Sequence, residues 1–548
     1  MSLPTANTEW PPKVLKNDVL PHLTRWSAWY SGSPHQLEAA YGGGGKWAPH
    51  ALPIWRDQPT QWARDGAGTM AHHIWGKLAS EDQEVRLHVP IAGDISAMSA
   101  NLLFGEAPKI AFGGNDRAGT QFVEDLIEDG LWSRLRQAAE IQSALGGVYL
   151  RAVWDQNLRA RAWTVPVHPD VAVPEWAHDR LRAVTFWEIV WQEGNTVWRH
   201  LERHEPGYII HGMYRGTPQE LGERVAFRDA PAEGGYLPPD IVDGQDEGVI
   251  PTGLDDGSLT AWYVPNILPN RIWRNVPTAA NWGRSDYSGV EDAMAALDVA
   301  WTSWMRDIRL GKARLIMDRS ALSPLAEGKG AFVDLDKELY VGMNLGLDVD
   351  KVPIEQVQFA IRVEEHARTC DALREAIIQG AGYSMITFTG ETEGAAVTAT
   401  EIQNKAKRTL MTQDMKRDYW DSVLPEVVVT LARLQSFVFG DGADLEVPNV
   451  EWPESVQPGQ LETAQTIAAL DAAKAISAET KVRMFHPDWD DKRVAEEVQA
   501  ISGLEDASRM AEAVSRFNTA SALGDVDEPT RSAFRNRLTG PVRGEVER

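Results

Sequence analysis

One long helix is the feature that most constrains this chain. Residues 285–314 predict a helix in which apolar side chains recur at alternating intervals of four and three residues. Acidic residues stand at its start and basic residues at its end, an order that suits the helix dipole. At 1.5 Å per residue, a helix over 290–312 would be roughly 34 Å long. Such a narrow stripe predicts packing against a partner helix or a neighbouring copy, although a buried helix of a large enzyme fits the periodicity equally. The six residues of this seam are Val290, Met294, Leu297, Trp301, Trp304 and Ile308.

Length and composition are those of an ordinary globular protein. The 548 residues suffice for about two to four domains with sizeable cores. A single cysteine, Cys370, excludes an intrachain disulfide. The chain does not open on a basic segment followed by an apolar run, and it contains no run of about 18 apolar residues. We therefore expect no signal peptide and no membrane partner.

The net charge of −25 argues against several classes of DNA-binding protein. Because a duplex is itself densely negative, this chain should not hold DNA tightly through its general surface, as a repressor or a histone-like protein does. A protein that DNA must pass without sticking remains compatible with this charge. The 22 tryptophans also suggest sugars stacked on exposed rings, but most of them lie in periodic or strand-like runs where packing is the better explanation.

The pattern along the chain predicts an α+β protein that is mainly helical. Pro90 and Gly105 bound a first helix, and a second helix is expected over about 119–145. Residues 148–228 are rich in Val, Trp, Tyr and Thr, with a turn at 193–195, and predict an antiparallel β-region. Residues 229–260 look like an exposed loop because Gly, Pro and Asp are frequent there.

The second half has an order that is unusual for an enzyme. After the long helix come strand-like runs in 313–352, a helix over about 354–379 and a Gly- and Thr-rich loop over 380–397. A further helix extends to about residue 436 with an expected kink at Pro425, and the tail from 460 looks helical. The centre of the chain therefore combines a small mixed insert with three long helices.

No catalytic or metal-binding signature stands out. The glycines at 42–45 lack the spacing of a phosphate-binding loop, and no nucleophile elbow occurs. His200, His204 and His211 could share a metal, but surface histidines of a β-region explain them better. We therefore predict no enzyme activity, no catalytic residues, no metal and no cofactor.

Five stretches, in this order, resemble the portal proteins of tailed bacteriophages, in the branch typical of phages of actinobacteria. They are VPIAGDISAMSANLLFGEAP at 89–108, SALGGVYLRAVWD at 143–155, LRAVTFWEIV at 181–190 with HLERHEPG at 200–207, VPNILPNRIWR at 264–274 running into the long helix, and SAETKVRMFHPDWDD at 477–491. None is a catalytic signature, and their joint order carries the resemblance. Residues 1–80 and 505–548 match it poorly.

The resemblance implies a portal fold with wing, stem, clip and crown regions, assembled into a dodecameric ring. Carried onto this chain, 1–284 would be an N-terminal wing region, with a helical part at about 85–147, an antiparallel β part at 148–228 and a loop at 229–260. The stem helices would be 285–312 and 353–380, with the clip at 313–352 between them. The tunnel loop would be 381–398, the long kinked wing helix and following segment 399–459, and a crown-like helical region 460–548.

The same resemblance suggests which residues meet DNA. The tunnel loop would line the narrowest part of the channel and contains no Lys or Arg, so it should not grip DNA by charge. Channel candidates are Thr389, Glu391, Glu393, Lys405, Lys407 and Arg408. The basic end of the first stem helix, near the clip, is a second candidate, although dipole pairing and salt bridges between subunits with Asp298 or Asp307 explain it equally. Its residues are Arg306, Arg309, Lys312 and Arg314.

The partners implied are further copies of the chain, the double-stranded DNA that passes through the ring, the terminase large subunit, the head–tail adaptor protein, and the major capsid protein with a scaffold. The protein would be assembled in the host bacterial cytoplasm and would reside at the portal vertex of the virion. Two alternatives stay open: a soluble hydrolase acting on glycans, and another structural protein of the capsid or connector.

Overall fold

The computed structural model describes residues 3–41, 87–113, 116–231, 248–254, 256–276, 278–310, 314–318, 340–343, 355–357, 362–389, 399–440, 445–453, 467–473, 475–486, 489, 492–502 and 515. These residues form a mixed α+β structure, as the sequence predicted. The chain divides into two compact units. The first comprises residues 1–393 and 404–455, and the second comprises 394–403 and 456–548.

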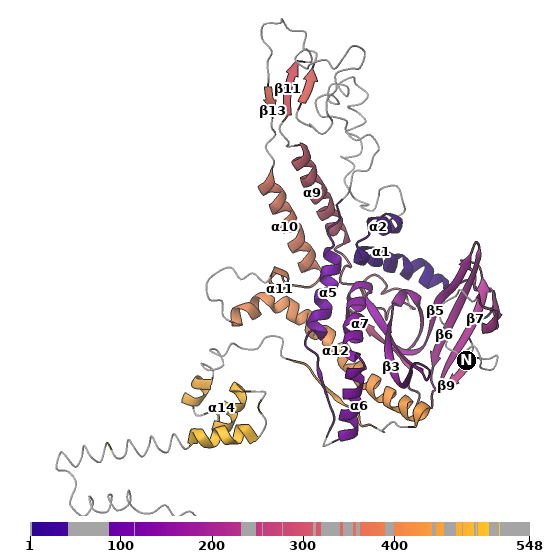
Figure 1. Cartoon of the computed structure of the whole chain (residues 1–548), viewed down its shortest axis with the longest axis vertical. Coiled ribbons are helices and arrows are strands. Elements are labelled where there is room, and N and C mark those ends of the chain that lie inside the picture. The colour runs from indigo at the N-terminus through magenta and orange to yellow at the C-terminus, as the bar shows by residue number, and fades with distance from the viewer. Residues whose placement is uncertain are drawn as a thin grey trace, which may run out of the picture. The chain divides into compact units, whose positions relative to one another are not determined.

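Helices from the N-terminal part build the body of the first unit (Figure 1). Helix α5 begins directly after Pro90 and ends at Gly105, as predicted. The single helix expected over 119–145 is instead two helices, because Gly130 adopts φ 87° and interrupts the helical backbone. The elements are η1 (Leu15–Val19), α1 (Leu20–Ser31), α2 (Pro34–Ala40), α5 (Ile91–Phe104), α6 (Arg117–Glu128) and α7 (Leu131–Leu145).

The strands that follow form two antiparallel sheets, which confirms the predicted β-region. A three-stranded sheet has the order β10-β2-β3, and a larger sheet has the order β4-β5-β6-β7-β8, with β9 also pairing with β7. Strand β9 lies within the range 229–260, so the loop predicted there contains a strand. The strands are β2 (Gly147–Asp155), β3 (Arg159–Val167), β4 (Ala172–Ala177), β5 (Arg180–Glu193), β6 (Thr196–Glu205), β7 (Tyr208–Gly216), β8 (Glu223–Val225), β9 (Val249–Pro251) and β10 (Ala261–Pro265).

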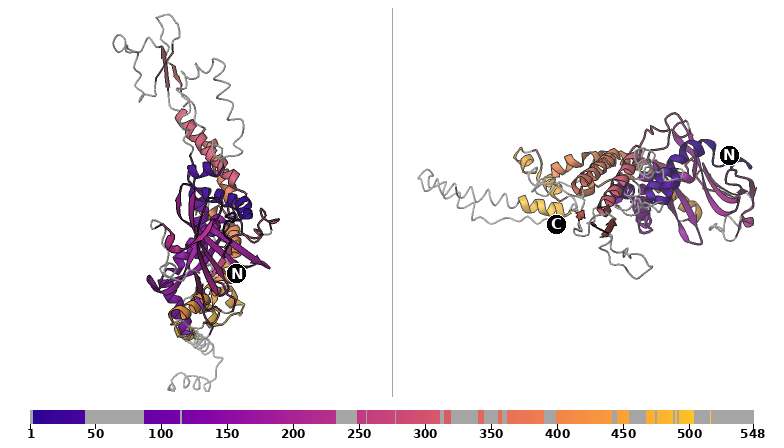
Figure 2. Two further views of the ribbon diagram at one scale, coloured as in Figure 1. Left: turned by 90° about the vertical axis from the view of Figure 1, so that its right-hand side faces the viewer. Right: turned by 90° about the horizontal axis from the view of Figure 1, so that it is seen from above.

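Helices α9 (Glu291–Leu310) and α10 (Val363–Gly380) pack side by side as a hairpin (Figures 1 and 2). The chain between them carries β11 (Arg314–Asp318), β12 (Tyr340–Met343) and β13 (Glu355–Val357). Strand β13 pairs antiparallel with β11, and for this reason the second helix begins at Val363 rather than near residue 353. The strand-like run predicted at 331–335 lies outside the described residues.

After the hairpin come the short α11 (Ile386–Thr389) and the 41-residue α12 (Ala399–Phe439). Pro425 lies inside α12, which continues as a helix on both sides of it. The segment Ala406–Phe439 is long and apolar enough to cross a membrane by length and composition, but half of its most apolar window is buried inside the protein, as in a core helix. A two-stranded ribbon joins β1 (Lys109–Ala111) to β14 (Asn449–Glu451).

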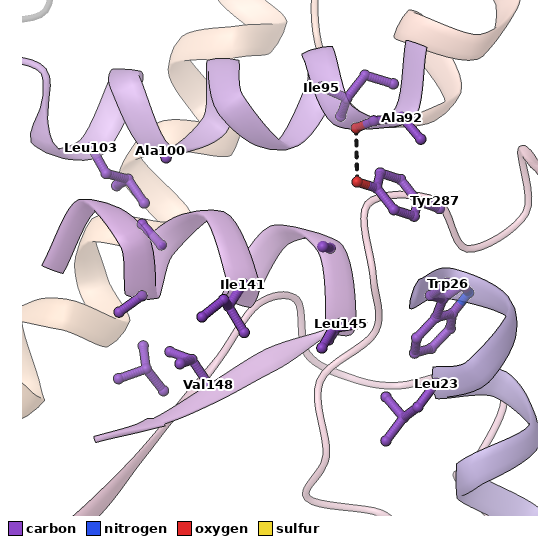
Figure 3. Packing of buried hydrophobic residues seen from close by; sticks show 14 of the residues in the cluster. Leu23, Trp26, Ala92, Ile95, Ala100, Leu103, Ile141, Leu145, Val148 and Tyr287 are labelled. Carbon is purple, nitrogen blue, oxygen red and sulfur yellow. Dashed lines mark hydrogen bonds between the residues drawn. The ribbon is translucent and has the colours of Figure 1, made fainter. Parts of the chain in front are cut away.

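The main core joins these helices and the small sheet into one cluster. Figure 3 shows how α1, α5, α7 and β2 contribute to it, and how the Tyr287 hydroxyl donates a hydrogen bond of 2.7 Å to the carbonyl of Ala92. The labelled apolar side chains of the cluster are Leu23, Trp26, Ala92, Ile95, Ala100, Leu103, Ile141, Leu145 and Val148. Because Tyr287 and Val290 belong to this core, the start of α9 is anchored in the body.

The second unit contains α14 (Ala478–Phe485), capped by the Ser477 side chain, and a helix over 492–502. Between them the rings of His486 and Trp489 are stacked 3.8 Å apart, and the Arg493 guanidinium lies over Trp489. The helical character expected from residue 460 onward is therefore present in this described part.

Candidate functional site at the base of the hairpin

A buried ion pair lies where both ends of the α9/α10 hairpin meet the body. The Nζ atom of Lys416, on α12, is 2.7 Å from Oδ2 of Asp286, which lies just before α9. Their side chains are 2% and 0% exposed. Burying a charge is costly unless it is paired and hydrogen-bonded, so the surroundings of this pair decide whether it can be stable.

The ammonium group of Lys416 has a partner for each of its three protons. Besides Asp286, Nζ donates to the Ser99 hydroxyl of α5 at 2.7 Å and to the Tyr383 hydroxyl at 3.0 Å. Tyr383 follows α10, so this one lysine contacts segments that precede α9 and follow α10. Burial lowers the pKa of Lys416, and the charge of Asp286 opposes that shift.

The Asp286 carboxylate is equally well satisfied. Its Oδ2 accepts hydrogen bonds from the hydroxyls of Ser143, on α7, at 2.6 Å and Tyr383 at 2.7 Å. Its Oδ1 accepts one from the Asn266 side-chain amide at 2.8 Å. Six segments of the first unit therefore converge on one charge pair. We call it the hairpin-base network, and its residues are Ser99, Ser143, Asn266, Asp286, Tyr383 and Lys416.

The Ser99–Lys416 contact brings together the residue types of a nucleophile and its base. The carboxylate of Asp286 stabilises the charged ammonium, whereas a base needs a free lone pair on Nζ. Both side chains are also buried. The geometry is therefore that of a structural ion pair.

A second charged cluster joins the other end of the hairpin. Oδ2 of Asp307, on α9, is 2.9 Å from both the Arg362 guanidinium and Nε2 of His366, on α10. The hydrogen bond from His366, together with Arg362, lowers the pKa of Asp307. The His366 ring also stacks on Trp304 at 6.0 Å. These contacts link the two helices near the C-terminal end of α9, shortly before β11.

Most of the predicted seam of α9 packs within the chain. Val290, Met294 and Leu297 are buried in the main core, and Trp301 and Trp304 pack against it. Ile308 alone of the six seam residues is exposed, at 40%. The seam therefore serves the fold of the single chain, and its role toward a neighbouring copy stays a prediction.

The proposed partners of the basic end are already engaged inside the chain. Asp298 lies 2.8 Å from Nδ1 of His88, and Asp307 pairs with α10 as described. Arg306 is half-buried on α9. Lys312 and the side chains of Arg309 and Arg314 lie outside the described residues.

Three of the channel candidates can be placed. Thr389 is exposed at the end of α11, and Lys407 and Arg408 are exposed in the first part of α12. Glu391, Glu393 and the side chain of Lys405 lie outside the described residues. The structure brings α11 to α12 through Thr387, whose hydroxyl is 2.8 Å from that of Thr409.

The three histidines of the β-region are buried, which corrects the expectation that they lie on the surface. His200 bonds to Glu188 and His211 at 3.1 Å each, and His204 bonds to Glu202 at 2.8 Å. Arg151 also pairs with Glu202. Among the residues that the structure describes, no group of three or more His, Cys, Asp or Glu side chains could hold a metal ion.

We call these side chains the sheet network: Arg151, Glu188, His200, Glu202, His204 and His211. Burial lowers the pKa of His211 to about 3. Burial alone would raise the pKa of Glu202, but Arg151 and the hydrogen bond from His204 hold it well below its usual range. The network therefore keeps the buried carboxylate of Glu202 charged and the imidazole of His211 neutral inside the β-region.

Sequence reasoning did not find Lys416 or Asp286. Lys416 stands in the charged run MTQDMKRDYW and Asp286 in SDYSG, where nothing distinguishes them from solvated neighbours. The available signal was spacing, since Lys416 shares a helical face with Thr409, Gln413 and Trp420. If that face had been interpreted as buried, the lysine on it would have been predicted to lie in the core with a partner.

No family model and no curated protein matches this chain. Solved structures similar to it include the neck of an empty GTA particle computed with C6 symmetry, at 12% identity and a TM-score of 0.38, covering 75% of this chain and 94% of that one. The neck of a native GTA particle computed with C12 symmetry is similar at 12% identity and a TM-score of 0.38, covering 77% of this chain and 98% of that one. A likeness this weak says nothing about what this chain binds or builds.

Proposed function

We propose that this chain is the portal protein of a tailed bacteriophage, a structural protein without enzyme activity that forms a ring at one vertex of the capsid. Twelve copies would surround a channel through which DNA is packaged and later ejected. The insert between α9 and α10 would dock the terminase large subunit and then the head–tail adaptor. The rim of the ring would contact the major capsid protein.

The observation that carries this proposal is the order of elements from α9 to α12. A helical hairpin whose connecting segment carries β11, β12 and β13 is followed by a short helix and then by the 41-residue α12. The portal resemblance of the sequence implies the same order of stem, clip, stem, tunnel loop and long wing helix. The hairpin would then be the stem, and residues 381–398, which include α11, would form the tunnel loop.

The exposed face of α10 suits a passage for DNA. Glu364, Glu365, Asp371 and Glu375 are exposed there, against Arg368, which pairs with Glu364, and the partly exposed Arg374, which pairs with Asp371. If this face lined a channel, it would repel phosphates and let the duplex slide. Lys407 and Arg408 are the described residues that we propose to meet DNA electrostatically.

The glycan hydrolase is supported less well. Such an enzyme needs two carboxyl groups free to act on a bound sugar. The buried carboxylates Asp286, Asp298 and Glu202 each face a lysine, a histidine or an arginine within the fold. They behave as structural anions, and we propose no reaction for them.

The test is electron microscopy of the purified full-length protein by negative stain, both alone and after co-expression with its capsid protein. We expect rings with a central hole and roughly twelvefold symmetry. A portal can stay monomeric when expressed alone, so the presence or absence of rings in the co-expressed sample is the decisive result. Capsids that assemble and package DNA normally when the gene is deleted would refute the proposal.

A further inference from the structure

Helix α12 buries a polar stripe where a core helix ordinarily buries an apolar one. Thr409, Gln413, Lys416 and Trp420 follow one another at intervals of four, three and four residues, so they share one face. All four are at most 4% exposed. The apolar seam of α9 has the same spacing, so the two helices differ in the chemical type of the residues on that face.

The residues of the stripe bond to several parts of the body. Thr409 Oγ1 accepts from the backbone N–H of Ser384 at 2.8 Å, and Gln413 donates to the carbonyl of Leu102 on α5. Trp420 Nε1 donates to the side-chain carbonyl of Gln142, on α7, at 3.0 Å.

Lys416 adds the ion pair with Asp286 described above. Beside the stripe, the Thr412 hydroxyl donates to the carbonyl of Gly382 at 2.6 Å. Gly382 has φ 97°, a conformation that favours glycine, so the chain after α10 is held close to α12 by a backbone turn that few residues could replace.

A polar stripe constrains a helix differently from an apolar one. Apolar side chains can repack against other apolar neighbours of similar volume, whereas a buried donor or acceptor is costly away from its own partner. Buried polar residues that specify register in paired helices are the best-attested use of such groups. Four successive residues of this kind allow one axial position only.

We propose that this stripe is a register lock: it fixes the axial position of α12 against the base of the α9/α10 hairpin, with the Asp286–Lys416 pair as its strongest contact. A displacement of the first turns of α12 must then either be carried to the base of the hairpin or break the pair. The inference concerns the single chain and stands whether or not the proposed ring forms.

The decisive variant of the full-length protein removes both charges at once, Asp286→Asn with Lys416→Met. Replacing both members of a buried pair is often neutral for stability, while removing one leaves an unpaired buried charge. We expect the double variant to keep the equilibrium constant for folding within about tenfold of wild type, and Lys416→Met alone to lower it by about two to four orders of magnitude.

Hydrogen–deuterium exchange measured by mass spectrometry then distinguishes a local loosening of α12 from a loss of global stability. In the double variant, amides over residues 405–416 and 381–389 should exchange at least tenfold faster, while α5 and α7 stay as in wild type. Unchanged exchange in α12 at restored stability would overturn the proposal. Arg433→Met is the matched control, since this arginine pairs with Asp256 at the exposed far end of the same helix. It should leave exchange over 405–416 unchanged.

A milder variant keeps the test decisive if the double variant does not fold. Thr409→Val conserves volume, removes the acceptor used by Ser384 and leaves the ion pair intact. We expect faster exchange confined to residues 381–389 and the first turns of α12. If exchange in Thr409→Val equals wild type, or rises uniformly over the first unit, the stripe does not set register.

Discussion

Two buried polar networks among the described residues of the first unit differ in the cation that pairs with the carboxylate. In the hairpin-base network a lysine holds Asp286, and all three protons of its ammonium group are bonded. In the sheet network Glu202 is held by Arg151 and His204, beside a neutral His211. A lysine stays charged through the physiological pH range, whereas histidine can gain a proton within it. The two networks should therefore differ in how strongly acid destabilises them.

The largest expected effect breaks the hairpin-base network. Asp286→Ala leaves Lys416 as a buried, unpaired cation among hydroxyl groups, and we expect the free energy of unfolding to fall by about 3–5 kcal/mol. Chemical denaturation followed by tryptophan fluorescence would measure it. A loss under about 1 kcal/mol would mean that Lys416 reaches water or another anion, or gives up its proton, and the contrast between the networks would disappear.

The second prediction sharpens the comparison through pH. Because the pKa of His211 is lowered to about 3 in the fold, its contribution to stability is present above the unfolded value and is lost as pH falls below it. Taking an unfolded pKa of ~6.5, this histidine should cost about 2 kcal/mol of stability between pH 7 and pH 5.

His211→Gln keeps a hydrogen-bonding side chain that does not titrate, so it should flatten the decline by that amount. His35→Gln, at an exposed histidine of α2, is the matched control and should leave the slope as it is. An identical slope in wild type and His211→Gln would show that the sheet network does not sense acid.

A smaller effect is expected at the edge of the hairpin-base network. Thr409→Val removes two hydrogen bonds from the stripe on α12 and conserves its volume, so we expect a loss of about 1–2 kcal/mol. The same denaturation experiment would measure it. If Thr409→Val lowered the free energy of unfolding as much as Asp286→Ala, the hydroxyl groups would contribute as much to stability as the charges.

The smallest effect is expected where a similar ion pair lies in water. Arg433 and Asp256 are 40% and 48% exposed, so Arg433→Met should change stability by no more than about 0.5 kcal/mol. A large loss would indicate that pairing itself, and not burial, determines the energetics of both regions.

Much of the local structure was predictable from particular residues. Pro90 and Gly105 bound α5 as expected, and the turn at 193–195 separates β5 from β6. The apolar spacing over 285–314 predicted a helix, and α9 occupies most of that range. These features depend on neighbours a few residues apart, which a sequence displays directly.

Errors arose where distant segments meet. The start of α10 was placed too early because pairing of β13 with β11 outweighs the local helical pattern. The histidines of the β-region were assigned to the surface. The sequence of a single strand does not reveal which of its faces will pack against another sheet.

The sequence by itself determined the type and order of many helices and strands, because periodicity and turn residues act over a few positions. Tertiary structure alone decided that the stripe on α12 is buried with its lysine, and that the seam of α9 serves its own chain. A polar side chain has the same local conformational preference whether it ends up in water or in a core. Its burial is stable only when folding brings hydrogen-bond partners within reach.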